Sequence, residues 1–360
     1  MTRDQRESIR MRSETIEDQA VADTNSRDKS PAGRLASLPF FILYLTDRCS
    51  SRCGSCDYWR HGKTDIGLDD VLRLIPELRR LGTDTVAVSG GEPLQNPSWV
   101  AITSALREAG FKLWLLTSGI SLLKQVDEAT RLFDTITVSL DAADRDTYRA
   151  IRGVDSFQHV CAGIRAAVAR RAAVCLRCTV QKGNFLQLPG IVSLAKSLGV
   201  KQLSFFAVDA HTHDAFGRAD GFERNLGLQP EDLQKLAGIL DAMERDFAFE
   251  FQTKFIAESP QKLRRLHQYF AATNGAGGYP AVRCNAPEFS AVIEANGNIR
   301  PCYFISGPAE ANAKSGLEQS LNSPDFVALR RDIRERKRPE CERCVCSKWW
   351  GERDKVNPGL

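Results

Sequence analysis

Three cysteines, Cys49, Cys53 and Cys56, lie within eight residues of one another in the segment CSSRCGSC. Cysteine thiolates bind zinc and iron–sulfur clusters. A structural zinc site normally closes a tetrahedron of four ligands, whereas this segment supplies three. A centre held by three thiolates leaves one metal position open to an outside ligand, and an open position is typical of a reactive site. Zinc completed by a distant residue is the alternative interpretation.

A second group of cysteines follows residue 280. Cys284 and Cys302 enclose seventeen residues, and Cys341 and Cys344 complete a set of four. Four thiolates suit a fully ligated 4Fe–4S cluster. Cys346 could replace Cys344 as a ligand or be a spare thiol. The alternative for the whole group is a zinc ribbon that only fastens the C-terminal part of the chain.

The other cysteines, Cys161, Cys175 and Cys178, are expected to fill the core, as unpaired cysteines often do. Cys175 and Cys178 are three residues apart in a predicted strand. Their side chains therefore point to opposite faces and cannot share a metal.

The elements that must position the cysteines alternate between two patterns from Pro39 onward. Short apolar and β-branched runs are typical of strands, and the longer stretches between them have a helical period. Several runs are apolar on both faces, as buried parallel strands are. The alternation predicts an α/β fold, a partial (β/α)6 TIM-like barrel. The predicted strands span residues 40–46, 85–89, 112–117, 135–140, 174–180 and 202–208.

A polar segment follows each predicted strand: the cysteine loop, GGEP, TSG, SLDA, QKGN and DAHTHD. Loops at the carboxyl ends of parallel barrel strands build the active site, so we expect the site on this rim. In GGEP, the bare backbone amides of Gly90 and Gly91 are expected to approach a ligand closely.

The chain divides into three predicted parts. Residues 1–36 are polar and charged, with too little apolar surface to offset the entropy of ordering, so we expect a disordered tail. Residues 37–280 contain the barrel. Residues 281–360 form a small cysteine-rich extension that we expect to pack beside it, with a β-hairpin turn at the NGN of 296–298 and a helix over 325–337.

The composition indicates the cellular location of the protein and the redox state of its thiols. The sequence has no apolar run long enough to span a membrane and no signal-peptide core, so we expect a cytoplasmic protein. Thiols stay reduced in the cytosol, which favours metal ligands over disulfides. The net charge of +4 gives no nucleic-acid signal by itself.

The cysteine spacing and the rim motifs resemble the radical S-adenosylmethionine (SAM) superfamily over residues 40–210. In that family a 4Fe–4S cluster on three cysteines binds SAM at its open iron, and reductive cleavage of SAM gives a 5′-deoxyadenosyl radical that takes hydrogen from a substrate. The resemblance makes the three loop cysteines the cluster ligands. It implies SAM contacts from Gly90, Gly91, Glu92, Ser139, Arg152 and the backbone of Val208.

One position departs from the family pattern. The residue before the third cysteine is usually aromatic and contacts adenine, but here it is Ser55, so the resemblance implies only a backbone contact. Tyr58 or Trp59 could supply the missing ring or pack under the loop.

The later cysteines resemble the auxiliary-cluster extension of radical SAM enzymes, in the shortened Twitch form of 2-deoxy-scyllo-inosamine dehydrogenase-type enzymes. The longer SPASM form binds two auxiliary clusters and uses more cysteines than the five that follow residue 280 in this chain. The resemblance therefore implies one auxiliary 4Fe–4S cluster, with Cys346 as the alternative ligand in the set Cys284, Cys302, Cys341 and Cys344.

These resemblances imply a radical SAM oxidoreductase that oxidises a small molecule, sugar- or cyclitol-like, by two electrons in cofactor or natural-product biosynthesis. Asp209 and His211 are candidate general bases, because an oxidation must also lose a proton. Tyr303, beside a predicted cluster ligand, is a further candidate at the rim. The alternatives are a peptide-modifying maturase, a cyclase related to molybdenum cofactor synthesis, and a non-catalytic iron–sulfur electron carrier.

A basic run, RRDIRERKRPE, spans residues 330–340. Such a run usually is a solvated helix face. It could also be a docking patch, formed by Arg331, Arg334 and Lys337, for an acidic electron donor such as flavodoxin or ferredoxin.

Overall fold

The computed structural model describes residues 33–209, 211–213, 215–218, 226–346 and 348–350. Residues 35–360 form one compact unit. Most of the predicted N-terminal tail lies outside the described residues. Leu35, near the end of that predicted tail, is buried, and its amide donates a hydrogen bond to Asn322 Oδ1 at 2.7 Å.

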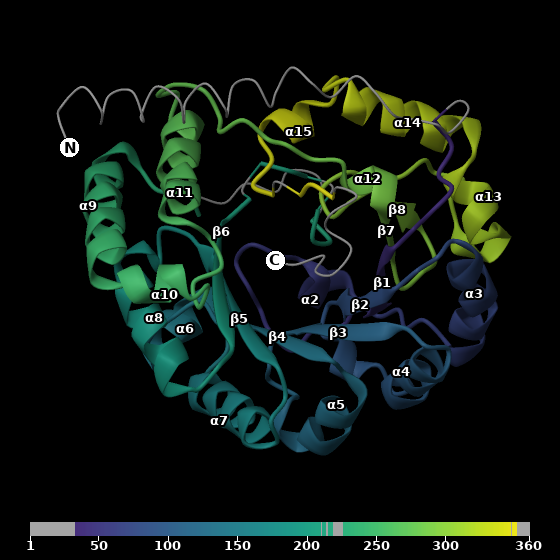
Figure 1. Cartoon of the computed structure of the whole chain (residues 1–360), viewed down its shortest axis with the longest axis horizontal. Coiled ribbons are helices and arrows are strands. Elements are labelled where there is room, and N and C mark those ends of the chain that lie inside the picture. Colours follow the sequence, from purple (N-terminus) through teal and green to yellow (C-terminus); the bar gives the residue numbers. More distant parts are fainter. Residues whose placement is uncertain (1–32, 210, 214, 219–225, 347, 351–360) are drawn as a thin grey trace, which may run out of the picture. The chain divides into compact units, whose positions relative to one another are not determined.

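The six predicted strands form a parallel sheet in sequence order, as expected for a partial barrel (Figure 1). Their bounds match the predicted ranges to within one residue, and each strand pairs with the next along the chain. The strands are β1 (Phe40–Thr46), β2 (Thr85–Gly90), β3 (Lys112–Thr117), β4 (Thr135–Ser139), β5 (Val174–Val180) and β6 (Gln202–Ala207).

Helices cover the outer face of the curved sheet (Figure 1). They are α3 (Leu68–Arg80), α4 (Trp99–Glu108), α5 (Val126–Leu132), α6 (Arg145–Arg152), α7 (Phe157–Ala169), α8 (Leu188–Ser197), α9 (Pro230–Asp246), α10 (Ala248–Gln252) and α11 (Pro260–Thr273). A short helix, α2 (Tyr58–His61), follows the cysteine loop.

The core has two layers because successive residues of a strand point to opposite faces. Phe41 and Leu43 of β1 belong to the large cluster between sheet and helices. Phe40, Ile42 and Tyr44 belong to a second cluster on the inner face. Burial on both faces explains why β1 reads as a continuous apolar run. The three cysteines expected in the core, Cys161, Cys175 and Cys178, are buried, which confirms that prediction.

The C-terminal extension continues the sheet instead of only packing beside it. Its hairpin, predicted at NGN, consists of β7 (Ser290–Ile293) and β8 (Ile299–Arg300), and β7 pairs in parallel with the free edge of β1. The sheet order is therefore β6-β5-β4-β3-β2-β1-β7-β8, an open sheet with β6 and β8 at its ends in the described part of the chain.

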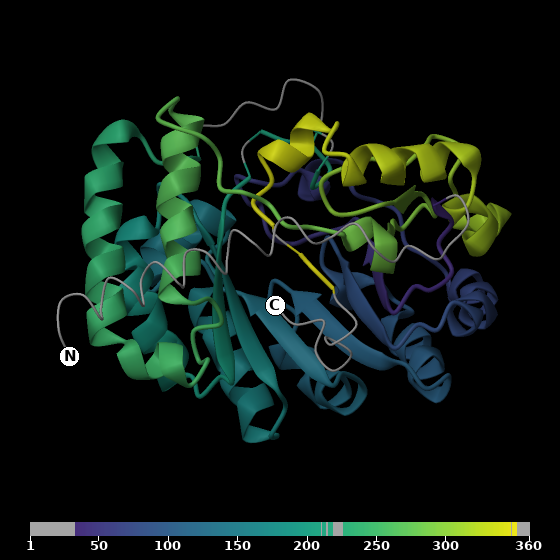
Figure 2. The ribbon, with the colours of Figure 1, turned by 45° about the horizontal axis from the view of Figure 1, so that its top comes forward.

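Short helices complete the extension. They are α12 (Ala286–Phe289), α13 (Leu317–Leu321), α14 (Pro324–Arg334) and α15 (Pro339–Glu342). The helix predicted over 325–337 corresponds to α14 but ends three residues earlier. Figure 2 shows the chain after α15 descending toward the strands of the barrel.

Candidate functional site

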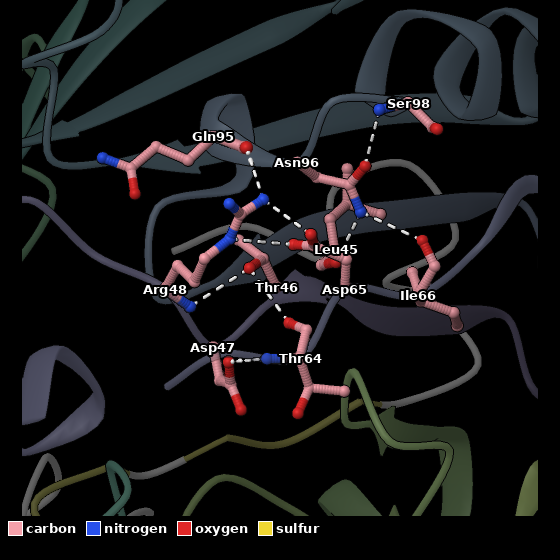
Figure 3. Close-up of polar contacts among 10 residues, drawn as sticks. All are labelled: Leu45, Thr46, Asp47, Arg48, Thr64, Asp65, Ile66, Gln95, Asn96 and Ser98. Carbon is pink, nitrogen blue, oxygen red and sulfur yellow. Dashed lines mark hydrogen bonds and ion pairs between the residues drawn. The ribbon is translucent and has the colours of Figure 1, made fainter. Parts of the chain in front are cut away.

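The cysteine loop begins where β1 ends, and polar contacts fix its first residues (Figure 3). Arg48 donates from Nη2 to Asp65 Oδ2 at 2.6 Å and to the carbonyl oxygen of Gln95 at 3.0 Å. The amide of Thr64 donates to Asp47 Oδ1 at 2.6 Å. The residue directly before the first cysteine is thereby held against the segments that precede α3 and follow β2.

Asn96 is the buried centre of the same network (Figure 3). Its Nδ2 donates to the carbonyl oxygens of Leu45 at 2.7 Å and Ile66 at 3.0 Å, and its Oδ1 accepts from the amide of Ser98 at 2.7 Å. One side chain therefore joins the end of β1 to two other segments.

The two glycines of GGEP let the end of β2 approach the cysteine loop. The amides of Gly91 and Glu92 donate to the carbonyl oxygens of Thr46 and Arg48, each at 2.7 Å. A Cβ on Gly90 or Gly91 would lie 2.2 Å from one of these same oxygens, and Gly90 has a φ of +124°. The Gly91 amide, which we expected to approach a ligand, holds the loop instead, and a SAM contact through the Gly91 carbonyl oxygen stays a prediction.

The Glu92 carboxylate is fully buried and bonded within the protein. It accepts hydrogen bonds from Thr117 Oγ1 at 2.8 Å, from the amide of Ser118 at 2.9 Å and from the Ser118 hydroxyl. Burial raises the pKa of Glu92, although these hydrogen bonds oppose the shift. The side chain thus fastens the motif after β2 to the motif after β3.

The C-terminal end of α6 holds the middle of the cysteine loop. The amides of Arg52 and Gly54 donate to the carbonyl oxygens of Arg152 at 2.8 Å and Ile151 at 3.3 Å. Gly153 ends the helix with a φ of +68°, and a Cβ there would lie 2.5 Å from the Arg52 carbonyl oxygen. Only glycine fits this approach.

Arg152 lies against the second cysteine. Its Nη1 donates to Cys53 Sγ at 3.6 Å, and its Nη2 pairs with the buried Asp141 carboxylate at 2.6 Å. The buried Nε of Arg152 has no hydrogen-bond partner among the described residues. A donor left over beside the cysteine loop fits the carboxylate contact to SAM implied for this residue.

The segment after β6 folds back over the same loop. Arg218 is buried, and its Nε and Nη2 donate to the carbonyl oxygen of Ser55 at 3.1 and 2.9 Å. Its Nη1 lies 3.4 Å from Asp209 Oδ2 and 2.8 Å from the carbonyl oxygen of Thr212. The carbonyl oxygen of Ser55 therefore already accepts two hydrogen bonds from a guanidinium, and the backbone contact of Ser55 with adenine stays a prediction.

The two candidate bases have different surroundings. Asp209 is buried, and its carboxylate binds Arg218 and also accepts from the amides of His211 at 3.0 Å and Thr212 at 3.2 Å. His211 is exposed. The contacts of Asp209 favour a positioning role, and proton transfer by either residue stays a prediction.

The two aromatic residues after the loop differ in position. The Tyr58 ring packs edge-on against Tyr44 with centroids 6.1 Å apart, inside the inner core cluster. Trp59 donates from Nε1 to the carbonyl oxygen of Cys56 at 2.9 Å. It also lines an open cavity of about 770 Å³ with Cys49, Ser50, Arg52 and Arg60. Trp59 thus borders open space beside the first cysteine, whereas Tyr58 packs in the core, and a contact of Trp59 with adenine stays a prediction.

The three loop thiols lie close enough together to influence one another electrostatically. Burial, reinforced by Glu92 and Cys53, raises the pKa of Cys49 to about 12, and burial together with Cys53 raises that of Cys56 to about 12. A coordinated metal deprotonates such thiols. Among the described residues, no three His, Cys, Asp or Glu side chains are arranged to hold a single metal ion.

The structure also brings the later cysteines together. Burial raises the pKa of Cys302 to about 12, and Cys284 and Cys341 raise it further, so these two thiols lie within electrostatic reach of Cys302. The Cys344 thiol is close to both Cys302 and Cys284. Cys346 lies within electrostatic reach of Cys284 and Lys348 in the extension and of Arg177 in the barrel. Cys344 as the fourth ligand, with Cys346 as the alternative, stays a prediction.

The remaining SAM residues lie at strand ends. Ser139 is the last residue of β4 and is half-buried. Val208 directly follows β6, is buried, and donates its amide to the carbonyl oxygen of Val180 at 2.8 Å. Only its carbonyl oxygen is left for a backbone contact with adenine, and that contact stays a prediction.

The predicted docking patch is locally balanced in charge. Arg334 pairs with Glu288 at 2.7 Å, and Lys337 pairs with Glu335 at 2.5 Å. Arg331 lies 3.9 Å from Asp332. This pairing weakens the case for an electron-donor site there, which stays a prediction.

Sequence reasoning missed Asn96 and Arg218, which hold the loop from opposite sides. An asparagine after a turn and an arginine in an irregular segment carry no local signal, because their partners are 51 and 163 residues away in sequence. Among the described residues, no helix combines the length and apolarity needed to cross a membrane.

Two protein-family models match the chain. Residues 43–188 match the radical SAM superfamily, and residues 284–345 match SPASM, an iron–sulfur cluster-binding domain.

Curated relatives match the barrel part of the chain. A protein of Saccharolobus solfataricus named probable GTP 3′,8-cyclase is 29% identical over 166 residues, covering 45% of this chain and 54% of that protein. GTP 3′,8-cyclase 2 of Mycobacterium tuberculosis H37Rv is 34% identical over 172 residues, covering 45% and 47%. The chain spans about half the length of these relatives.

Solved structures share the fold over most of the chain. SuiB of Streptococcus suis bound to S-adenosylmethionine has a TM-score of 0.63 at 16% identity, covering 89% of this chain and 74% of SuiB. A structure of anSMEcpe with bound AdoMet and a peptide has a TM-score of 0.60 at 16% identity, covering 86% and 88%. The chain therefore carries a radical SAM domain over residues 43–188, of the kind that binds a 4Fe–4S cluster and SAM, and a SPASM-type domain for auxiliary iron–sulfur clusters over residues 284–345.

Proposed function

We propose that this radical SAM protein is an oxidoreductase that removes a hydrogen atom from a carbon of a small, sugar- or cyclitol-like molecule and oxidises it by two electrons. The cluster and SAM, when bound, supply the radical chemistry. The observation that carries the proposal is the stacking of Tyr44 on Tyr303, with ring centroids 6.4 Å apart. Tyr44 lies five residues before Cys49, and Tyr303 follows Cys302, so an auxiliary cluster would lie beside the substrate space and could accept the second electron.

We assign the SAM-binding cluster to Cys49, Cys53 and Cys56, and one auxiliary cluster to Cys284, Cys302, Cys341 and Cys344. Arg152 and Ser139 are the proposed contacts to the SAM carboxylate. We further propose a cytoplasmic location and an electron donor such as flavodoxin or ferredoxin.

Anaerobic reconstitution with iron, sulfide, SAM and dithionite tests the proposal. We expect about eight irons per chain, four for each cluster, and formation of 5′-deoxyadenosine. Replacing Cys284 and Cys302 by Ala should leave about four irons per chain and retain SAM cleavage. Deuterium should still pass from a candidate substrate into 5′-deoxyadenosine, but no oxidised product should form. About four irons in the unmodified protein would contradict the auxiliary cluster.

The same assay separates the alternatives. A carrier or scaffold would form no 5′-deoxyadenosine. A maturase would transfer deuterium only from labelled peptides, a possibility raised by the peptide bound in the anSMEcpe structure. A cyclase would act on GTP, as the names of the curated relatives indicate for those proteins. Product formation from a peptide or GTP alone would overturn the small-molecule assignment.

A further inference from the structure

Arg177 projects from the middle of β5 into the barrel. Its Cα partners are Ser139 on β4 and Ser204 on β6, so these three side chains lie on the same face of the sheet. The Arg177 guanidinium carbon lies 4.9 Å from the centroid of the Phe206 ring and 5.9 Å from that of Trp114. Aromatic faces stabilise a guanidinium, but they do not neutralise its charge.

This guanidinium has unused hydrogen-bonding capacity. Its Nε is buried with no partner, and within the described ranges its side chain makes no hydrogen bond or ion pair. The residue as a whole is half-buried, and a guanidinium that is partly withdrawn from water is normally paired with a counter-ion. The planar fork of arginine matches carboxylate and phosphate oxygens.

Lys348 places a second cation in the same space. Its Nζ lies 5.8 Å from the centroid of the Phe40 ring, which in turn is 6.0 Å from the ring of Trp114. Arg177 and Lys348 are close enough to repel each other.

Asn285 holds the Lys348 segment in place. Its amide donates to the carbonyl oxygen of Lys348 at 3.0 Å. Its side chain exchanges hydrogen bonds with the backbone of Trp350, at 2.9 Å from Nδ2 and 2.8 Å to Oδ1. The last described residues are thereby fixed so that the lysine points into the barrel.

The Cys346 thiol, the Tyr303 hydroxyl and the Glu258 carboxyl lie within electrostatic reach of Arg177, and Glu258 is the carboxyl among these three groups. Its Oε2 accepts a hydrogen bond from the amide of Phe205 at 3.0 Å, and it forms no ion pair with Arg177. Burial raises the pKa of Glu258 and so favours its neutral form. Glu258 is therefore a poor counter-ion for Arg177.

We propose that Arg177 and Lys348 form an anion-binding site inside the barrel, and that the substrate carries a carboxylate or phosphate group. Ser139, the proposed SAM contact, is the strand neighbour of Arg177, and Tyr303, beside Cys302, lies within electrostatic reach of Arg177. The site would thus hold the substrate between SAM and the auxiliary cysteines, with Phe206 and Trp114 as an apolar wall. This role in substrate binding rests on the proposed function, whereas binding of an anion does not.

Calorimetric titration of the anaerobic holoenzyme, at constant ionic strength, tests the site with two probes, inorganic phosphate and benzoate. We expect saturable binding of at least one probe, and the tighter one identifies the anion class. Arg177→Met should weaken binding about tenfold or more, because charge-assisted hydrogen bonds are lost. Arg177→Lys should weaken it less, and Lys348→Met should also weaken it. Arg131→Met, on the exposed side of α5, is the matched control and should leave affinity unchanged.

Three outcomes would overturn the proposal, and a fourth would contradict only the proposed function. If neither probe binds, or if Arg177→Met binds as the unmodified protein does, no such site exists. If SAM affinity falls in Arg177→Met by the same factor as probe affinity, the arginine serves the SAM carboxylate. If Arg177→Met leaves probe affinity unchanged but shifts the reduction potential of the auxiliary cluster, the arginine balances the negative charge of that cluster. Absence of SAM cleavage alongside normal anion binding would sink the proposed function but leave the anion site standing. Iron content and circular dichroism identify variants that misfold. If Arg177→Met misfolds, the anion affinity of Arg177→Lys decides whether the arginine binds the anion.

Discussion

At the residue scale, the site depends on close backbone approach more than on ligand contacts from single side chains. Gly91 shows this most directly. The sequence made it a glycine of a ligand-binding turn, but its amide bonds the chain just before the first cysteine. A glycine motif indicates that the backbone approaches another group closely. Only the tertiary structure shows whether that group belongs to a ligand or to another segment of the chain.

Replacing Gly91 by Ala should therefore damage the cysteine loop. The added Cβ would meet the Arg48 carbonyl oxygen at 2.2 Å, and backbone atoms can move away only by displacing the loop. We expect a loss of about 1–3 kcal/mol in stability and fewer bound irons per chain. Gly238→Ala, in α9 with no atom within 4 Å of the added Cβ, is the control and should be neutral or stabilising by up to about 1 kcal/mol. Equal iron content in both variants would contradict this reading.

Glu258 should give the protein a measurable pH dependence. Its folded-state pKa is raised by burial, so the folded protein holds this proton more tightly than the unfolded chain does. The free energy of unfolding should fall as pH rises above the unfolded value of about 4.3 and level off above the folded pKa. Glu258→Gln should show a smaller fall, because Glu92 keeps its own raised pKa, and Glu310→Gln, at an exposed position, should retain the full fall. Unfolding midpoints of the anaerobic protein from pH 4 to 8 provide the comparison, and superimposable profiles for all three proteins would refute the assignment.

At the element scale, the strands and their rim loops could be predicted because hydrophobic period and chain order are local properties. The contacts that shape the loops could not, since they join distant segments. The segment after β6 is the clearest case: Asp209 looked like an accessible base in a polar rim loop, yet Arg218 folds back and occupies it. Nothing in the spacing of DAHTHD announces an arginine that reaches Ser55.

The pair formed by Asp209 and Arg218 should be a positioning device for the cysteine loop. Arg218→Met removes both hydrogen bonds to the Ser55 carbonyl, and Asp209→Asn leaves the buried guanidinium without its carboxylate. Both variants should lose iron from the first cluster and become more sensitive to oxygen, because Arg218→Met leaves the Ser55 carbonyl oxygen unsatisfied and Asp209→Asn removes the negative charge that compensates the buried guanidinium. The measurements are iron content and the rate of cluster bleaching in air.

The base assignment predicts a different pattern. If Asp209 transfers a proton to or from the substrate, Asp209→Asn should keep its iron and cleave SAM normally while failing to form product. Arg218→Met would then lose iron while Asp209→Asn would not. If both residues only position the loop, the two variants should lose iron alike.

At the scale of the whole molecule, the extension and the barrel are one sheet. The predicted division at residue 280 follows the change in sequence pattern, but β7 completes the hydrogen bonding of β1. Sequence could indicate the hairpin from its Asn-Gly turn; it could not indicate which edge the hairpin would join, because pairing between distant strands leaves no local trace. The cysteines of the extension are thus positioned by the strand that leads into the first cysteine loop.

A proline in β7 should therefore affect both parts of the molecule. Val292 pairs with Ile42 of β1 and Arg300 of β8, and proline would remove its amide from this ladder. We expect Val292→Pro to lose the auxiliary iron, lower the unfolding midpoint and reduce SAM cleavage. Val292→Ala keeps the amide and should retain both clusters with a smaller loss of stability. A proline variant that loses auxiliary iron yet cleaves SAM at the full rate would show that the two parts are independent.

The pairing of β1 with β7 also has a consequence for biosynthesis. Phe40 finds its partner Ser290 only about 250 residues later in the chain. Until the ribosome has released that segment, FFILYLT presents one unpaired edge, and an apolar edge strand of this kind readily pairs with other chains. We expect the nascent protein to need protection at β1 by a chaperone, and cluster loading to follow release of the completed chain.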